Sequence, residues 1–254
     1  MSASARALTL DCPQCGGENR PRSGERIFAC VFCSAALFVD RSQVVSFYRL
    51  PATVDRNAAE AALRRWMAGN RTVKGLDREA RVEELEQIAF PLWMFRVRGP
   101  RGDQVFVEPA APTPIPQIAD LTIPAGRLEP YRAVEEAGSG VDVAVPLETA
   151  RGWLEQRGEL EIEETSLVRV PLWSAGYRFR GASYRAIVDG ATGEVLAAVY
   201  PEKAESPYVG VAVLGMVLFV VEGLLIENPI VKLLVYALTA LPLFGLGYLV
   251  VRKV

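Results

Sequence analysis

Phe90-Pro91-Leu92-Trp93-Met94-Phe95-Arg96-Val97-Arg98-Gly99 lies in the middle of the chain and has a counterpart that runs from Val170-Pro171-Leu172-Trp173 to Gly181. In both stretches apolar and basic side chains alternate, which is typical of a strand. A helix-like segment with its own tryptophan, Trp66 or Trp153, precedes each stretch. The sequence therefore predicts an α+β fold with an internal repeat of two helix-plus-strand units that form antiparallel sheet(s).

The helix of the first unit is predicted from about Asp55 to Ala68. Thr53 or Asp55 can cap its first amide groups, and Gly69-Asn70 supply a stop signal. Its apolar face contains Leu63, Trp66 and Met67. Large aromatic side chains dominate core energetics, so the tryptophans are predicted to anchor the core and not to stack on a ligand.

Two further patterns surround the second unit. The run from Glu108 to Pro116 is too rich in proline for a helix, which predicts an extended crossing segment that is either a linker or a strap over a sheet. Two strand-like runs between Ser183 and Tyr200 flank Asp189-Gly190-Ala191-Thr192-Gly193, which predicts a β-hairpin. These glycines would also suit a phosphate-binding turn, but no helix follows them.

The four cysteines lie near the N-terminus as two Cys-x-x-Cys pairs. Two pairs at this separation present four thiolates to one tetrahedral metal ion, and four protein sulfurs leave no position for water. The predicted ligands of a structural Zn2+ are therefore Cys12, Cys15, Cys30 and Cys33. Gly16-Gly17 are predicted to supply positive-φ freedom after the first pair.

Two alternative roles of the cysteines are weaker. Two disulfides need an oxidising compartment, and no apolar stretch of signal-peptide length precedes Cys12. A redox-active pair needs a β-α-β context, which is not seen around either pair.

The N-terminal segment resembles the zinc ribbons of the general transcription factor TFIIB type, which also occur in many bacterial membrane proteins. The residues that carry the resemblance are Cys12, Pro13, Cys15, Gly16, Cys30 and Cys33. Such ribbons bind DNA, RNA or protein, or cap a domain, so the resemblance implies a metal and leaves the partner open.

Two apolar segments close the chain. The first runs from Pro207 to Ile226 and is interrupted by Glu222, and the second runs from Leu233 to Val251. The lengths predict a hairpin of two transmembrane helices joined at Glu227-Asn228-Pro229, provided that the Glu222 side chain bends toward the headgroups. The flanking cations Lys203, Arg252 and Lys253 then predict a protein of the inner membrane with both termini in the cytoplasm.

These signals divide the chain into five regions. They are the ribbon at 1–43, the first repeat at 44–107, the Pro-rich crossing segment at 108–140, the second repeat at 141–204 and the membrane hairpin at 205–254.

The composition argues against an enzyme. The chain has no histidine, which removes the usual general base near neutral pH and every His-ligated metal site. The glutamates between Glu155 and Glu164 alternate with apolar residues, so they predict the solvent face of a strand and not a catalytic carboxylate pair. The protein is therefore predicted to be non-catalytic.

The arrangement as a whole resembles bacterial membrane proteins with a TFIIB-type ribbon, some of which work beside SPFH (flotillin-like) and phage-shock-protein-A-like proteins. The resemblance implies an adaptor or scaffold at the inner membrane, with the lipid bilayer and such proteins as partners. A membrane-tethered nucleic-acid binder is the alternative, since Arg20, Arg22 and Arg26 could contact phosphate. The net charge of −2 provides no general attraction to nucleic acid.

Overall fold

The computed structural model describes residues 9–99, 102–132, 139–158, 160–203 and 206–253. It divides into two units. Unit 1 contains residues 1–66 and 80–200, and unit 2 contains residues 67–79 and 201–254.

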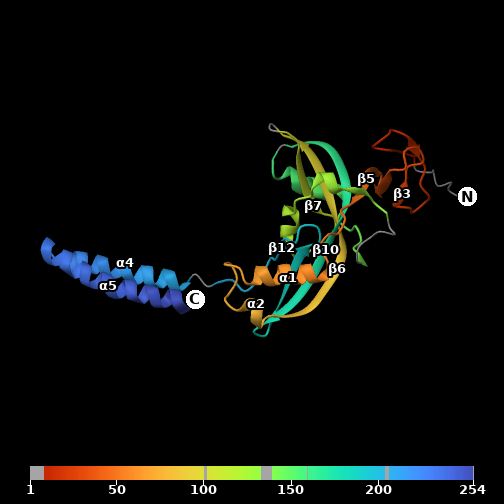
Figure 1. The fold of residues 1–254 in the computed structure, drawn as a ribbon. Helices are drawn as coiled ribbons and strands as arrows, with labels where there is room; N and C mark the ends of the chain where they lie inside the picture. Colours follow the sequence, from red (N-terminus) through yellow and green to blue (C-terminus); the bar gives the residue numbers. More distant parts are fainter. Residues whose placement is uncertain (1–8, 100–101, 133–138, 159, 204–205, 254) are drawn as a thin grey trace, which may run out of the picture. The chain divides into compact units, whose positions relative to one another are not determined.

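Unit 1 contains, among its described residues, a ten-stranded sheet built around two long antiparallel strands, β6 (Arg81–Arg98) and β10 (Glu161–Phe179) (Figure 1). The path β12-β11-β10-β5-β4-β3 crosses the sheet, β6 also pairs with β7 and β9, and β8 pairs with β5. The shorter strands are β3 (Ile27–Ala29), β4 (Ala36–Asp40), β5 (Gln43–Arg49), β7 (Gln104–Pro109), β8 (Glu129–Pro130), β9 (Ser139–Gly140), β11 (Ala182–Asp189) and β12 (Val195–Leu196). The two repeated stretches therefore share one sheet.

The register of β6 against β10 relates the two repeats by a local two-fold axis. Phe90 lies directly opposite Val170, and these residues occupy the same position in the two copies of the repeated sequence. Each strand then turns back in the same way, since β7 pairs with β6 and β11 pairs with β10. The similar sequences thus form equivalent hairpins on either side of the axis.

Two buried tryptophans connect each repeat to the helix of the other repeat. The Trp93 indole N–H donates to the Val145 carbonyl, just before α3 (Leu147–Glu155), and the Trp173 indole N–H donates to the Val54 carbonyl, just before α1 (Arg56–Met67). Both distances are 2.9 Å. Each tryptophan therefore holds the start of the helix that belongs to the other repeat.

Alternation along the strands divides the core between the two faces of the sheet. On one face, Leu92 and its neighbours pack against the proline-rich segment, which contributes Ile115 and Ile118. This segment includes two 3-10 helices, η1 (Pro116–Asp120) and η2 (Ala125–Arg127), and it is the strap over a sheet that one of the two predictions described. On the other face, Trp93 and Phe95 pack against α3 through Leu154.

Both helices of unit 1 receive an N-terminal cap from a carboxylate. Asp55 accepts a hydrogen bond from the Ala58 amide at 2.8 Å, as predicted for α1. The cap of α3 comes from a distant strand, because Asp40 of β4 accepts a hydrogen bond from the Leu147 amide at 2.8 Å. Such caps contribute about 0.5–2 kcal/mol each, and the second one connects β4 to α3.

Glu108 on β7 provides a test of how burial acts on a charge. Its side chain is 4% exposed, and its Oε1 lies 2.7 Å from Nη2 of Arg157. Burial raises its pKa above 4.5, and Asp120 adds to this effect, although Arg157 opposes it. The folded state therefore holds the proton more tightly than the unfolded state. Its stabilising contribution is present below pH 4.5 and is lost as the pH rises through the folded pKa.

We therefore expect Glu108→Gln, which cannot ionise, to gain stability relative to the wild type as the pH rises from 4 to 7. Urea unfolding at a series of pH values measures this difference. The exposed Glu155→Gln should follow the wild-type profile. A constant difference between Glu108→Gln and the wild type would contradict the assigned direction.

Unit 2 contains a short helix, α2 (Leu76–Glu79), and an antiparallel pair, α4 (Ser206–Leu225) and α5 (Pro229–Lys253). Within the residues that the structure describes, none of the helices combines the length and the apolar character needed to cross a membrane. The predicted transmembrane hairpin at 205–254 is therefore wrong, as is the predicted inner-membrane location with both termini in the cytoplasm. The fold is mixed α/β, with a large sheet and a cysteine cluster near the N-terminus.

The physical reason for this correction lies in the charged residues of the hairpin. The prediction treated Glu222 as a group that bends away toward headgroups, but it lies inside α4 and accepts a hydrogen bond from the Thr239 hydroxyl of α5 at 2.5 Å. Lys232 of α5 donates to the Gly223 carbonyl of α4 at 2.8 Å. Both charged side chains thus interrupt the apolar runs and join the two helices. Arg252 and Lys253 lie within α5 and not after it, and their side chains lie outside the described part.

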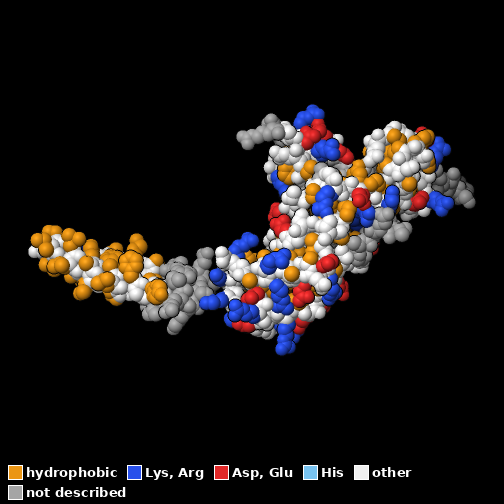
Figure 2. Space-filling model, viewed as in Figure 1, with side chains coloured by type: hydrophobic (Ala, Val, Ile, Leu, Met, Phe, Trp, Pro, Cys, Tyr) orange, Lys and Arg blue, Asp and Glu red, His pale blue; other side chains and the backbone are white. Residues whose placement is uncertain are grey.

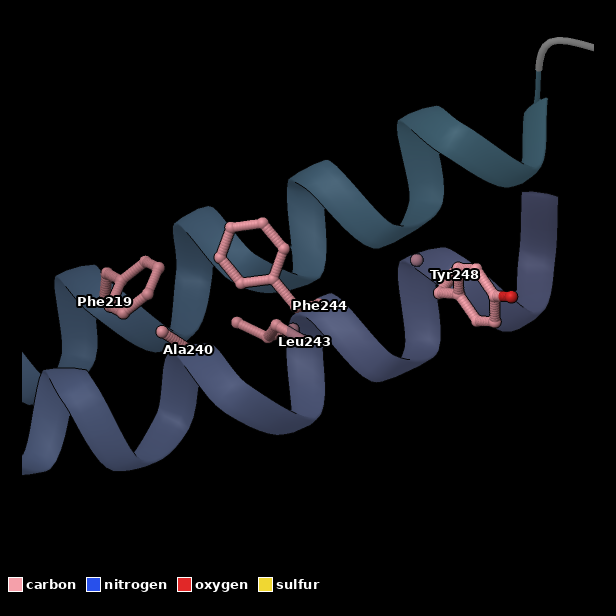
Figure 3. A pocket seen from close by; sticks show the side chains of 6 residues that line it. Phe219, Ala240, Leu243, Phe244 and Tyr248 are labelled. Atoms are coloured by element: carbon pink, nitrogen blue, oxygen red, sulfur yellow. The ribbon is translucent and has the colours of Figure 1, made fainter.

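The outward surface of the helix pair is apolar (Figure 2), and it includes the exposed side chains of Met216, Leu224, Leu238, Leu241 and Phe244. A hollow of about 430 Å³ lies along it, lined by Phe219, Ala240, Leu243, Phe244, Gly247 and Tyr248 (Figure 3). The described residues that line it contribute no carboxylate, amine or thiol.

Candidate metal centre

The four predicted ligands lie together in unit 1. The Sγ atoms of Cys12, Cys15, Cys30 and Cys33 all lie within 4.8 Å of one another. The Cys12–Cys33 and Cys15–Cys30 sulfur distances are both 3.7 Å, whereas a disulfide needs about 2.0 Å. Two ligands of a tetrahedral zinc ion with Zn–S bonds of about 2.3 Å lie ~3.8 Å apart. The cluster can therefore hold a metal ion, and its geometry is compatible with zinc.

Two equivalent backbone turns carry the sulfurs. In the first knuckle, residues 12–17, the Gly16 amide donates to the Cys12 carbonyl at 2.8 Å and the Cys12 amide to the Gly17 carbonyl at 2.9 Å. In the second knuckle, residues 30–35, the Ser34 amide donates to the Cys30 carbonyl at 2.9 Å and the Cys30 amide to the Ala35 carbonyl at 2.8 Å. The two knuckles thus have the same turn, and each turn directs its two sulfurs toward the centre of the four-sulfur cluster.

The two glycines of the first knuckle have different roles. Gly16 has a φ of +71°, as its predicted conformational freedom requires. Gly17 is needed for space and not for φ, because a Cβ there would lie 2.4 Å from the ring of Phe32. The Phe32 ring therefore rests on the backbone of the first knuckle, while the side chain remains 67% exposed.

Hydrogen-bond donors act on the pKa values of two of the thiols, Cys30 and Cys15. The amides of Cys33 and Phe32 and the side chain of Asn19 lower the pKa of Cys30 to about 6, although burial opposes them. The Gly17 amide also lowers the pKa of Cys15, but the neighbouring thiols, foremost Cys33, and burial raise it to about 12. These donors thus favour the thiolate form of Cys30, which is the form that binds a metal.

Asn19 supports the cluster and was not singled out in the sequence. It is buried on β2 (Glu18–Asn19), which pairs with β1 (Leu10–Asp11). Its Nδ2 lies 3.5 Å from Cys30 Sγ and donates to the Gly17 carbonyl at 2.7 Å, and its Oδ1 accepts from the Val31 amide at 3.0 Å. One side chain therefore joins the two knuckles. In the sequence, only the position of this asparagine between the two cysteine pairs indicates its role at the cluster, and this indication is weak.

The cluster is continuous with the sheet of unit 1. Cys12 and Cys30 are buried together with Ala35 and with Leu37 of β4. Strand β3, which leads into Cys30, pairs with β4, β4 pairs with β5, and β5 pairs in parallel with β10. A metal held by the four sulfurs would therefore fasten one end of this sheet.

Two of the three loop arginines that the nucleic-acid alternative depends on contact groups of the protein itself. Arg20 pairs with Glu18 at 2.8 Å. Arg26 lies 3.6 Å from Asp40 and stacks over the Phe38 ring at 4.7 Å. The structure thus directs two of the three cations toward the protein's own groups.

The other chemical alternatives from the sequence have structural roles. Asp189 is buried and accepts hydrogen bonds from the Ala191 amide at 2.8 Å and the Thr192 hydroxyl at 2.5 Å, so this turn is closed by its own side chain. The acidic run forms ion pairs across the sheet: Glu164 with Arg96 at 3.2 Å, and Glu161 with Arg98 at 3.4 Å. Glu159 of this run lies outside the described residues.

The fold and the cluster together define a mixed α/β protein with four clustered cysteines near its N-terminus that could hold a metal ion. Comparison of the chain with models of protein families, with curated proteins and with solved structures found no match.

Proposed function

We propose that the protein is a zinc-containing adaptor that binds a protein partner through its second metal knuckle and has no catalytic role. One observation carries the proposal. Val31 and Phe32, which lie between the ligands Cys30 and Cys33, are 78% and 67% exposed. A rigid metal knuckle that presents large apolar side chains to solvent is typical of a recognition surface.

Zinc is the ion that suits this donor set best. Four thiolates at tetrahedral spacing favour a soft or borderline ion that accepts four ligands. Zinc bound in this way has no open coordination position, so it stabilises the fold and activates no substrate. The donors around Cys30 and the bridging side chain of Asn19 support the site from outside.

The energetics of Phe32 favour a binding role. Full burial of such a side chain stabilises a protein by about 1.5–3 kcal/mol, and this chain leaves that stabilisation unused. Because the ring rests on Gly17, it is already ordered before a partner arrives, which lowers the entropic cost of binding. We expect a partner with an apolar pocket. The resemblance noted in the sequence makes flotillin-like and phage-shock-protein-A-like proteins the first candidates.

Chemical crosslinking of the full, zinc-loaded chain in extracts of its own cells tests this proposal. Phe32→Ala should keep its zinc and weaken capture of the partner by ~30-fold, the effect of losing about 2 kcal/mol at an interface. Val199→Ala removes another exposed apolar side chain of unit 1 and should capture the partner normally.

Equal capture by Phe32→Ala and by Val199→Ala would refute a role for the knuckle. Binding of DNA or RNA that weakens steeply with added salt and is unchanged in Phe32→Ala would favour the nucleic-acid alternative instead.

A further inference from the structure

Unit 2 contains a polar pocket of about 200 Å³, distinct from the metal centre. Its lining comes from the segment between α1 and β6 and from Lys203, far away in the sequence. Three cationic side chains contribute to it: Lys74, Arg78 and Lys203.

Backbone hydrogen bonds hold the two segments of the pocket together. The Val73 amide donates to the Pro201 carbonyl at 2.9 Å, and the Lys203 amide donates to the Arg71 carbonyl at 3.2 Å. Thr72 and Glu202, which lie between these bonds in the two segments, form an isolated antiparallel β-bridge. These bonds place Lys203 opposite Arg71, so the main chain fixes the two segments that carry the pocket-lining Lys74 and Lys203.

Thr72 and a glycine shape the wall of the pocket. The buried Thr72 hydroxyl lies 2.7 Å from the Met67 carbonyl and 3.0 Å from the Gly69 carbonyl, which fixes the turn after α1. Gly75 has a φ of +85°, so the chain reverses there and returns Arg78 to the same pocket as Lys74.

The charge balance of the lining is positive. Among the described lining residues, Asp77 is the one carboxylate. Its Oδ2 lies 3.7 Å from Nε of Arg78, a loose pair that leaves most of the guanidinium in solvent. Glu79 and Glu202 are not among the lining residues, although the Glu79 carboxylate lies close to Gly75, where a Cβ would be 2.9 Å from its Oε1. Within the described part of the chain, neither Lys74 nor Lys203 forms an ion pair. Two ammonium groups and a guanidinium are therefore offered to an anion.

We propose that this pocket binds a phosphate group carried by a small ligand. Drug-sized ligands occupy pockets of about 300–1,000 Å³, so a pocket of 200 Å³ suits a single phosphate group whose remainder stays outside. Lysine acts as a point charge toward phosphate, and arginine can bind two of its oxygens at once. A soluble phosphomonoester and a phospholipid headgroup both carry this chemistry. The site is independent of the proposed adaptor role, since it involves no residue of the ribbon.

The test compares the full, zinc-loaded chain with Lys74→Ala/Lys203→Ala and with a charge-matched control. Arg127→Ala/Arg185→Ala removes two exposed cations of unit 1 and leaves the pocket intact. Binding of inorganic phosphate and glycerol 3-phosphate is measured by calorimetry. Binding to vesicles of phosphatidylglycerol and of phosphatidylcholine is measured by co-sedimentation. Unchanged circular dichroism and melting temperature establish that each variant folds.

Removal of the two lysines should weaken binding at least tenfold, because the phosphate loses its charged hydrogen bonds to both ammonium groups. Loss of glycerol 3-phosphate binding would identify a soluble ligand, and loss of phosphatidylglycerol binding alone would identify a lipid headgroup. Contact of the apolar α4–α5 surface with vesicles would be the same for both lipids and both variants. No phosphate-dependent binding, or an equal loss in the arginine control, would overturn the proposal.

Discussion

Replacing Cys30 by serine should remove stoichiometric zinc from the purified chain and lower its thermal stability by a large amount. Cys30 is buried with Cys12 and Leu37, and its removal leaves three ligands for a site that needs four. Structural zinc sites bind with about 10–16 kcal/mol, so even a partial loss exceeds the effect of most substitutions. A loss of about 3 kcal/mol alone lowers the melting temperature by roughly 6–12 °C in a chain of this size. Elemental analysis measures the zinc, and circular dichroism measures the melting.

Gln14→Ala is the matched control for this experiment. It lies in the first knuckle and loses a hydrogen bond from its Nε2 to the Tyr48 hydroxyl at 2.8 Å, but it keeps all four sulfurs. This variant should retain its zinc and melt close to the wild type, whereas chelation of the wild type should reproduce the Cys30→Ser melting curve. One zinc per chain in Cys30→Ser would show that the sulfur cluster is not the metal site.

The features that the sequence predicts well are local ones. The spacing of two Cys-x-x-Cys pairs constrains the sulfurs through short turns, and the structure brings the same four sulfurs together. The Asp55 cap of α1 and the hairpin around Asp189 also depend on residues a few positions apart. In each case the interacting groups are close in the sequence, so residue type and spacing carry most of the information.

The features that the sequence misses depend on distant partners. Nothing near Val44 indicates that β5 pairs in parallel with β10, or that β4 provides the cap for α3 through Asp40. The prediction of a transmembrane hairpin at 205–254 failed for a related reason. A count of apolar residues does not reveal that Glu222 and Thr239 meet across two helices. The position of the Phe32 ring could not be predicted either, because its contact with Gly17 depends on the folded position of both knuckles.

Replacing Trp93 by alanine should destabilise the chain by about 3–5 kcal/mol, because the side chain is fully buried between β6 and α3 and its indole N–H is bound. Trp93→Phe keeps much of the packing but leaves the Val145 carbonyl without its donor, so it should cost about 1–3 kcal/mol. Trp153→Ala, at a half-exposed position of α3, should have a smaller effect than either variant. Urea unfolding measures all three.

The hydrogen bond from each tryptophan to the helix start of the other repeat also predicts which helix loses hydrogen-exchange protection in each variant. Trp93 belongs to the first repeat but holds the start of α3, so Trp93→Ala should lower the hydrogen-exchange protection of α3 more than that of α1. Trp173→Ala should do the reverse, because its indole holds Val54 before α1. If each substitution instead loosened the helix of its own repeat, the two tryptophans would act through the strand that carries them. The exchanged hydrogen bonds would then contribute little to the position of either helix.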